Sequence, residues 1–159
     1  MEDVSITAFD PLFAKDFADL NYQWIGEYFQ IEDHDREMLD DPFAYVVAKG
    51  GEVFFAVKEG EVLGTAAMIK IDAETMELAK MAVAAEHRGK GIADALLTRS
   101  IGFAREKGCR TICLESNTIL GPAINLYRKY GFKEIPLDQN SPYSRANVRM
   151  ELALSEAKM

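Results

Sequence analysis

The sequence Val83-Ala84-Ala85-Glu86-His87-Arg88-Gly89-Lys90-Gly91-Ile92-Ala93-Asp94-Ala95-Leu96-Leu97 is typical of a strand end, a glycine-rich turn and the start of an amphipathic helix. Gly89 and Gly91 permit backbone conformations that are closed to other residues. Small and aliphatic side chains then fall on one helical face, namely Ala93, Leu96, Leu97, Ile101 and Ala104. The helix start directs unpaired N–H groups and a positive dipole end outward, beside the cations Arg88 and Lys90. The pattern predicts a site for a phosphate or pyrophosphate group.

Two common phosphate-binding motifs do not fit this turn. The Walker motif requires Ser or Thr after Gly-Lys, and here Gly91 follows Lys90. The dinucleotide motif requires a third glycine where this chain has Asp94. The run Arg88-Gly89-Lys90-Gly91-Ile92-Ala93 instead resembles the Arg/Gln-x-x-Gly-x-Gly/Ala signature of the GNAT superfamily, the acetyl-CoA-dependent N-acetyltransferases. The resemblance implies that this turn holds the coenzyme's pyrophosphate, and the alternative is an ordinary strand-to-helix turn on a basic surface.

The composition is that of one soluble globular domain, which we place at residues 1–159. The chain has 159 residues, of which 48% are hydrophobic and 28% charged, so a disordered chain is excluded. A formal net charge of −8 disfavours a nucleic-acid partner. No apolar run has membrane-spanning length, the N-terminus is not a signal peptide, and the His and Cys spacing indicates no metal site. We therefore expect a cytoplasmic protein that binds neither membrane nor metal.

Hydrophobic periodicity predicts strands and helices in a defined order. Strands are expected at 4–9, 52–57, 62–71, 75–84, 110–115, 132–135 and 147–154. Helices are expected from Asp10-Pro11 to about Phe29, after Asp41-Pro42, from about 92 to 107, and after Pro122. The first helix places Trp24 and Tyr28 near its end, in the core or at a pocket wall. An antiparallel meander followed by a β-α-β crossover predicts a mixed α/β (α+β) sheet with helices on both faces.

A second block extends the resemblance over nearly the whole chain. Asn117 is followed, after five residues, by Ala123-Ile124-Asn125-Leu126-Tyr127-Arg128-Lys129-Tyr130-Gly131-Phe132. This resembles the family's Asn after the fifth main strand and its Leu-Tyr-x-Lys-x-Gly-Phe helix. The resemblance implies the GNAT fold, a mixed, mostly antiparallel sheet of six or seven strands whose middle strands splay apart around the pantetheine arm of acetyl-CoA. Family members commonly dimerise, so a homodimer is one expectation.

One carboxylate stands out in an apolar strand. An amine must lose a proton before it can attack a thioester, and a carboxylate can accept that proton. Glu77 lies in the strand Glu77-Leu78-Ala79-Lys80-Met81-Ala82-Val83, and by strand alternation we expect it to share a face with Met81 and Val83. Apolar burial would raise its pKa toward a useful value. In the resemblance Glu77 falls where several members place their general base. The alternative is a strand residue that pairs with Lys80 or with a neighbour across the sheet.

The resemblance assigns further coenzyme contacts to the same strand. Backbone groups of Met81, Ala82 and Val83 would pair with the amides of pantetheine as an added strand does. A backbone N–H near Met81 or Ala82 would stabilise the negative charge that develops on the thioester oxygen.

The second block supplies the remaining candidate residues. Tyr127 stands at the position of the family's usual general acid, and a phenol keeps its proton at neutral pH. An aromatic core residue is the alternative for Tyr127. Asn117 matches the motif and would hydrogen-bond the coenzyme, whereas Asn125, the weaker candidate, stands at a variable position.

The segments on the acceptor side do not identify a substrate. Residues 30–41 are acidic, which we interpret as a solvated face rather than as an electrostatic funnel for an amine. Ser141-Pro142-Tyr143-Ser144-Arg145 lies in the closing loop, where family members often contact the acceptor. Arg145 would either bind an acceptor carboxylate or form a surface ion pair with Asp138 or Glu134.

The sequence therefore predicts an enzyme that transfers the acetyl group of acetyl-CoA to a primary amine of a small molecule or peptide, by direct attack in a ternary complex. A non-catalytic acyl-CoA-binding or regulatory module is the first alternative, and the presence of both Glu77 and Tyr127 argues against it. A nucleotide-binding protein is the second, and the missing Walker Ser or Thr argues against that.

Overall fold

The computed structural model describes residues 3–137 and 145–154, which form a mixed sheet with helices packed on it. The strands are β1 (Ser5–Thr7), β2 (Glu52–Lys58), β3 (Glu61–Lys70), β4 (Thr75–Val83), β5 (Thr111–Ser116), β6 (Lys133–Ile135) and β7 (Val148–Ala153). The helices and helical turns are η1 (Pro11–Phe13), α1 (Ala14–Tyr28), α2 (Asp33–Asp40), η2 (Phe43–Val47), η3 (Ala85–His87), α3 (Ile92–Glu106) and α4 (Gly121–Lys129). The expected order of elements is confirmed, and residues 141–144 of the closing loop lie outside the described residues.

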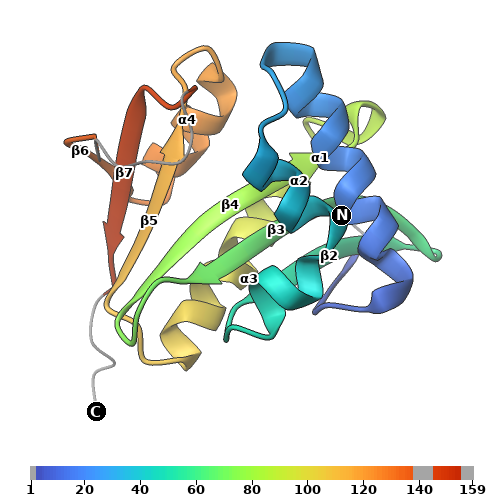
Figure 1. The fold of residues 1–159 in the computed structure, drawn as a ribbon, viewed down its shortest axis with the longest axis horizontal. Coiled ribbons are helices and arrows are strands. Elements are labelled where there is room, and N and C mark those ends of the chain that lie inside the picture. The colour runs from blue at the N-terminus through green and yellow to red at the C-terminus, as the bar shows by residue number, and fades with distance from the viewer. Residues whose placement is uncertain (1–2, 138–144, 155–159) are drawn as a thin grey trace.

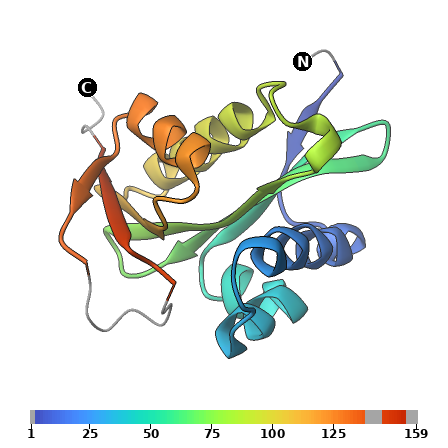
Figure 2. The same cartoon turned by 90° about the horizontal axis from the view of Figure 1, so that it is seen from above.

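The seven strands are ordered β1-β2-β3-β4-β5-β7-β6. Every neighbouring pair is antiparallel except β4 and β5, which run parallel because α3 crosses over between them. One face of the sheet is covered by α1, α2 and η2, and the other by α3 and α4 (Figures 1 and 2). The predicted mixed sheet with helices on both faces is confirmed.

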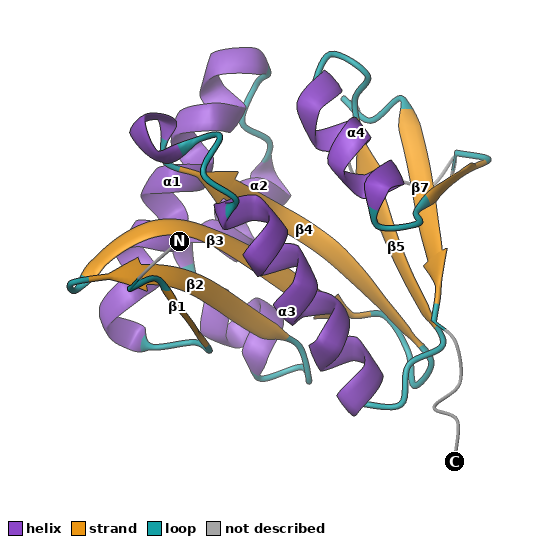
Figure 3. Cartoon of the chain, turned by 180° about the vertical axis from the view of Figure 1, so that it is seen from behind, coloured by secondary structure: helices purple, strands orange, loops and turns teal. Residues whose placement is uncertain are grey.

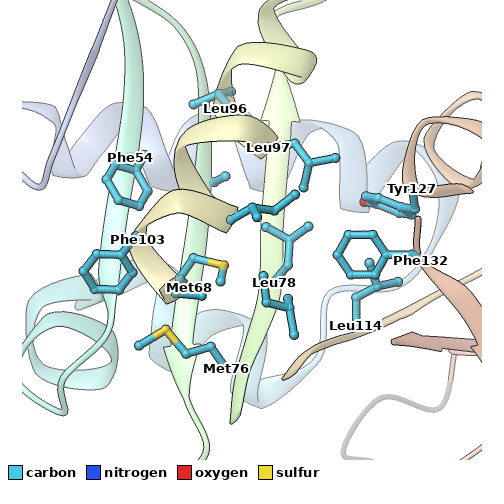
Figure 4. Packing of buried hydrophobic residues seen from close by; sticks show 14 of the residues in the cluster. Phe54, Met68, Met76, Leu78, Leu96, Leu97, Phe103, Leu114, Tyr127 and Phe132 are labelled. Atoms are coloured by element: carbon cyan, nitrogen blue, oxygen red, sulfur yellow. The ribbon is translucent and has the colours of Figure 1, made fainter. Parts of the chain in front are cut away.

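Each face has its own hydrophobic core. The core under α1 includes Phe17, Ile25 and Phe55, all fully buried. The core under α3 and α4 is larger and runs from Phe54 and Phe103 across to Tyr127 and Phe132 (Figure 4). These two cores are what the alternating strands and the amphipathic helices were expected to build.

Gly64 of β3 lets α3 lie close to the sheet. A Cβ at this position would lie 3.1 Å from side-chain atoms of both Ile92 and Leu96. Any larger residue would push the first turn of α3 away from the sheet, so Gly64 fixes where the glycine-rich turn presents its N–H groups.

The parallel pair β4–β5 stays together for only three residues. Thr75, Met76 and Glu77 oppose Thr111, Ile112 and Cys113, and no pairing continues beyond them. From there β5 is held by β7 on its other side, and β4 is held by β3. Figure 3 shows the two strands separating toward α4. The splayed strand pair that the family resemblance implies is present.

A β-bulge at Lys80 changes which residues share a face of β4. Ala79 opposes Ala67 and Ala82 opposes Thr65, so one extra residue is inserted, and Lys80 adopts a φ of 54°. The bulge reverses the alternation of side chains that follows it.

The expectation that Glu77 shares a face with Met81 and Val83 is therefore wrong. Glu77 pairs with Ile69, which packs in the core under α1. Met81 and Val83 pack in the core under α3, on the opposite face. Strand alternation holds only where pairing is regular, and the bulge lies between these residues.

Candidate active site

A cavity of about 300 Å³ occupies the gap between β4 and β5. Its wall includes Glu77 and Lys80, on the face covered by α1 and α2, and Val83 and Tyr127, on the face covered by α3 and α4. The cavity therefore has walls on both faces of the sheet. Its size lies within the range of small-molecule sites.

The edge of β4 that faces the gap offers backbone groups without a strand partner. Ala84 donates its N–H to the Leu63 carbonyl at 2.8 Å. Because successive N–H groups of an extended chain point to opposite sides, those of Val83 and Met81 point into the gap and that of Ala82 toward β3. Met81, Ala82 and Val83 all line the cavity. An extended ligand carrying amide groups can pair with this edge.

The glycine-rich turn has the conformation that the sequence predicts. Gly89 and Gly91 adopt φ values of 77° and 82°, and Gly91 is the residue before α3. The first N–H groups of α3 therefore face away from the helix body with the positive dipole end. Arg88 lines the cavity and donates from Nε to the Val83 carbonyl at 3.4 Å, so its guanidinium lies where the turn meets the gap.

The other residues of the turn, from Gly89 to Ala93, do not line the cavity. The side chain of Ile92 is buried in the core, and Ala93 is half-buried. Lys90 places its Nζ 3.4 Å from Nδ1 of His87, at a separate hollow beside β1. Of the two expected cations, the structure thus brings Arg88 to the cavity and places Lys90 beside the turn.

Glu77 is a largely buried carboxylate in the cavity wall. Burial raises its pKa to about 7, the nearby charge of Glu115 adds to the increase, and Lys80 and Arg149 oppose it. A carboxylate with this pKa can exchange a proton near neutral pH.

Tyr127 comes from α4 on the opposite face. Its ring packs against Phe132 with centroids 5.8 Å apart, and burial raises its pKa to about 12. Figure 4 shows the hydroxyl directed away from α4, toward β4. Tyr127 is thus both a core aromatic residue and a phenol at the cavity wall, and its role as the general acid stays a prediction.

An ionic cluster that the sequence did not reveal borders the cavity on the α2 side. Asp35 is fully buried, and its Oδ1 lies 2.5 Å from Nζ of Lys80. Arg145 binds both oxygens of Asp35, at 2.7 and 2.8 Å, and Oε2 of Glu32 at 3.2 Å. The cluster of Asp35, Glu32, Lys80 and Arg145 joins α2, β4 and the start of the last strand segment.

Two sequence expectations are corrected by this cluster. The acidic segment 30–41 is not simply a solvated face, because Asp35 is 0% exposed. Arg145 forms its ion pairs with Asp35 and Glu32 rather than with Glu134, and Asp138 lies outside the described residues. The composition of the segment does not distinguish the buried Asp35 from its exposed acidic neighbours. Its spacing of four residues from Leu39, on the buried face of α2, is consistent with burial.

The cluster also determines the protonation of its members. Burial by itself would raise the pKa of Asp35, but the hydrogen bonds from Arg145 and Lys80 outweigh it and hold the pKa of that carboxyl well below its usual range. Burial lowers the pKa of Lys80, and Asp35 opposes that shift. Asp35 is consequently an anion that holds two cations at the cavity wall.

The two asparagines differ in position. Asn117 lines the cavity, but its amide donates to the Arg145 carbonyl at 2.8 Å and its oxygen accepts from the N–H of Ile119 at 2.9 Å. Asn117 thus ties the loop after β5 to the segment before β7. Asn125 is exposed on α4 and does not line the cavity.

Within residues 3–137 and 145–154, no group of His, Cys, Asp and Glu is arranged to hold a metal ion. No helix in that same part of the chain has both the length and the apolar character needed to cross a membrane.

The parted strands, the glycine-rich turn at the start of α3 and the buried carboxylate define an α/β protein built around a cleft for an acyl-coenzyme. Residues 18–132 match the model of the Acetyltransferase (GNAT) family, and the chain belongs to this family. The resemblance drawn from the two sequence blocks is thereby confirmed. Acetyltransferases of this family use acetyl-CoA as the acetyl donor.

Solved structures share the fold over almost the full length. A GNAT-family acetyltransferase from Staphylococcus aureus Mu50 superposes with a TM-score of 0.86 at 19% identity, covering 96% of this chain and 99% of that one. An acetyltransferase from Salmonella typhimurium, solved with acetyl-CoA, gives a TM-score of 0.78 at 22% identity, covering 99% and 98%. At these identities the likeness concerns the fold.

Curated relatives share a shorter region. Human N-acetyltransferase 8B is 33% identical over 103 residues, which cover 62% of this chain and 45% of that protein. The N-acetylaspartate synthetase of Danio rerio is 35% identical over 100 residues, which cover 62% of this chain and 36% of that protein. The chain thus spans less than half the length of these two relatives.

Proposed function

We propose that this protein transfers the acetyl group of acetyl-CoA to a primary amine of a small molecule or peptide. The observation that carries the proposal is the cavity between β4 and β5, with Glu77 on one face of the sheet and Tyr127 on the other. Family membership and the structures solved with acetyl-CoA support the donor. A cytoplasmic location and a homodimer remain predictions from the sequence.

The residues at the gap fit the coenzyme. The free edge of β4 at Met81 and Val83 suits the two amides of pantetheine, and the turn at Gly89–Gly91 suits a pyrophosphate. Arg88 adds a cation at the junction of the two. When bound, acetyl-CoA supplies a thioester whose carbonyl carbon is open to attack by an amine.

Groups of this chain then accept the proton of the amine, stabilise the charge on the thioester oxygen and supply a proton to the leaving thiolate. Glu77, with its pKa near 7, accepts the proton that the amine must lose. The N–H of Met81 points into the gap and can stabilise negative charge on the thioester oxygen. Tyr127 holds its proton until the thiolate leaves and can then donate it.

Two measurements test the proposal. Acetyl-CoA should bind in calorimetry and raise the melting temperature at saturation, and thiol should be released when an amine panel is added. Desulfo-coenzyme A is the matched control, because it should bind but release no thiol. If acetyl-CoA binds and no amine in a broad panel is acetylated, the chain is an acyl-CoA-binding module and the proposed activity is wrong.

A further inference from the structure

We propose that the acceptor is a primary amine attached to an aromatic or other apolar body, with no carboxylate beside the amine. This inference rests on the proposed function and names the substrate class of the same site. It is carried by two independent features of the α1 and α2 side of the cavity, an aromatic wall and a set of charges that are paired with one another among the described residues.

The aromatic wall comes from the end of α1. Trp24, Tyr28 and Phe29 all line the cavity. Trp24 donates from Nε1 to Oδ1 of the fully buried Asn21 at 2.9 Å, and its ring meets Phe29 edge-on with centroids 6.4 Å apart. These contacts fix the indole in place, so the wall is formed before a ligand arrives.

Large apolar side chains of the cavity wall are also exposed. Tyr28 is 43% exposed and Ile119, from the loop between β5 and α4, is 62% exposed, and both line the cavity. Large apolar side chains exposed at the rim of a cavity gain free energy when an apolar ligand covers them. The body of the acceptor would lie between these two walls.

The cations on this side are already held by the protein's own acids. Among the described residues that line the cavity, the cations are Lys80, Arg88 and Arg145. Arg145 binds both oxygens of Asp35 and also Glu32, and Lys80 binds Asp35. The remaining cation, Arg88, lies at the glycine-rich turn, where phosphate is expected.

A carboxylate on the acceptor would therefore enter an unfavourable position. Two cations are matched by two acids, so a further carboxylate would compete with Asp35 and Glu32 for the same cations. Glu77 and Glu115 also line the cavity, and their charges interact. These carboxylates attract an ammonium group and repel a second acid.

Matched substrate pairs test the inference. With acetyl-CoA saturating, kcat/KM is measured for tyramine against tyrosine, tryptamine against tryptophan, and isoamylamine against leucine. Each pair has the same side group and differs by one carboxylate. The amine of each pair should be favoured by at least 100-fold. Aspartate, which the name of the Danio rerio relative suggests, should be among the poorest acceptors.

A variant pair tests the aromatic wall. Tyr28→Ala should raise KM for tyramine about tenfold while leaving the Kd of acetyl-CoA unchanged. Phe43→Ala is the control, because Phe43 is also a solvent-exposed ring, at 55%, and does not line the cavity. Equal KM values for the two variants would contradict the role of the wall.

The outcomes separate the inference from the function beneath it. If aspartate or tyrosine is acetylated as fast as tyramine, the acceptor class is wrong and the acetyltransferase function stands. If acetyl-CoA neither binds nor releases thiol with any of these amines, both proposals fail.

Discussion

The ammonium of Lys80 lies 2.5 Å from Oδ1 of Asp35, and neither side chain is more than 3% exposed. The pair joins the bulge of β4 to α2 across 45 residues of sequence. Asp35 also accepts hydrogen bonds from Nη1 and Nη2 of Arg145. One carboxylate therefore joins α2, β4 and the segment before β7 at the cavity wall. Removing it would leave the buried Lys80 and the half-buried Arg145 without their main partner, which costs more than the loss of an exposed pair.

We expect Asp35→Asn to lower the free energy of unfolding by roughly 3 kcal/mol at pH 7. The control is Asp33→Asn on the same helix. The side chain of Asp33 is 98% exposed and forms an ion pair with the exposed side chain of Arg36. That change should cost less than about 1 kcal/mol. Urea denaturation of both variants and the wild type measures the difference. Similar values for the two would show that the buried cluster does not stabilise the fold.

The pH dependence of this cluster has a definite sign. The pKa of Asp35 is lower in the folded protein than in the unfolded chain. Its contribution is therefore present above the ordinary pKa of an aspartate and lost as the pH falls through the folded value. The wild type should lose stability below about pH 4 faster than Asp35→Asn. If the free energy of unfolding, measured by urea titration, fell equally with pH in both proteins, Asp35 would not have the lowered pKa.

Most of the sheet and the conformation of the glycine-rich turn could be predicted because local patterns determine them. The glycines of the turn are required by its positive φ values, and Asn117 and Tyr127 stand at a fixed spacing within the second block. The acceptor side could not be predicted in the same way. The bulge at Lys80 arises from pairing with β3, and the burial of Asp35 arises from contacts with residues 45 and 110 positions away. The bulge leaves no local pattern in the sequence, and for Asp35 the only local indication is its spacing from Leu39 on α2.

Glu77→Gln should reduce kcat by roughly 100-fold or more at pH 8, because Gln cannot accept the amine's proton. In the wild type kcat should rise with pH through about 7, where Glu77 loses its proton, and then level. The variant should lack this rising limb. Stopped-flow or steady-state thiol release across pH 5.5–9 measures both profiles, and an unchanged limb in the variant would assign it to another group.

The raised pKa of Glu77 also predicts how the stability of the fold depends on pH. The pKa of Glu77 is raised from 4.5 to about 7 on folding, which corresponds to roughly 3 kcal/mol between the two protonation states. The folded protein keeps the proton in this range and the unfolded chain releases it, so stability falls as the pH rises toward 7. Glu77→Gln should therefore be more stable than the wild type at pH 8 and similar to it at pH 4. The exposed Glu61→Gln is the control and should change neither.

Tyr127→Phe should lower kcat by roughly 100-fold and leave the Kd of coenzyme A within a factor of two. Phe keeps the ring that packs against Phe132 and lacks only the hydroxyl, so the fold should be retained. Steady-state rates and calorimetry separate the two effects. A variant with unchanged kcat would leave Tyr127 as a core residue without a role as the acid.

Gly89 allows the binding turn to be tested against a matched position elsewhere. Gly89 and Gly60 have φ values of 77° and 79°, and at both a Cβ would meet nothing within 4 Å. Alanine at either site therefore introduces only backbone strain, which should lower stability by about 1–2 kcal/mol in each variant. Gly60 lies in the turn between β2 and β3, away from the cavity. Gly89 lies in the turn before α3, and its conformation sets the direction of the backbone N–H groups there. We expect Gly89→Ala to weaken coenzyme A binding at least tenfold and Gly60→Ala to leave it unchanged, as measured by calorimetry. If both variants bind coenzyme A as the wild type does, the turn does not hold the pyrophosphate.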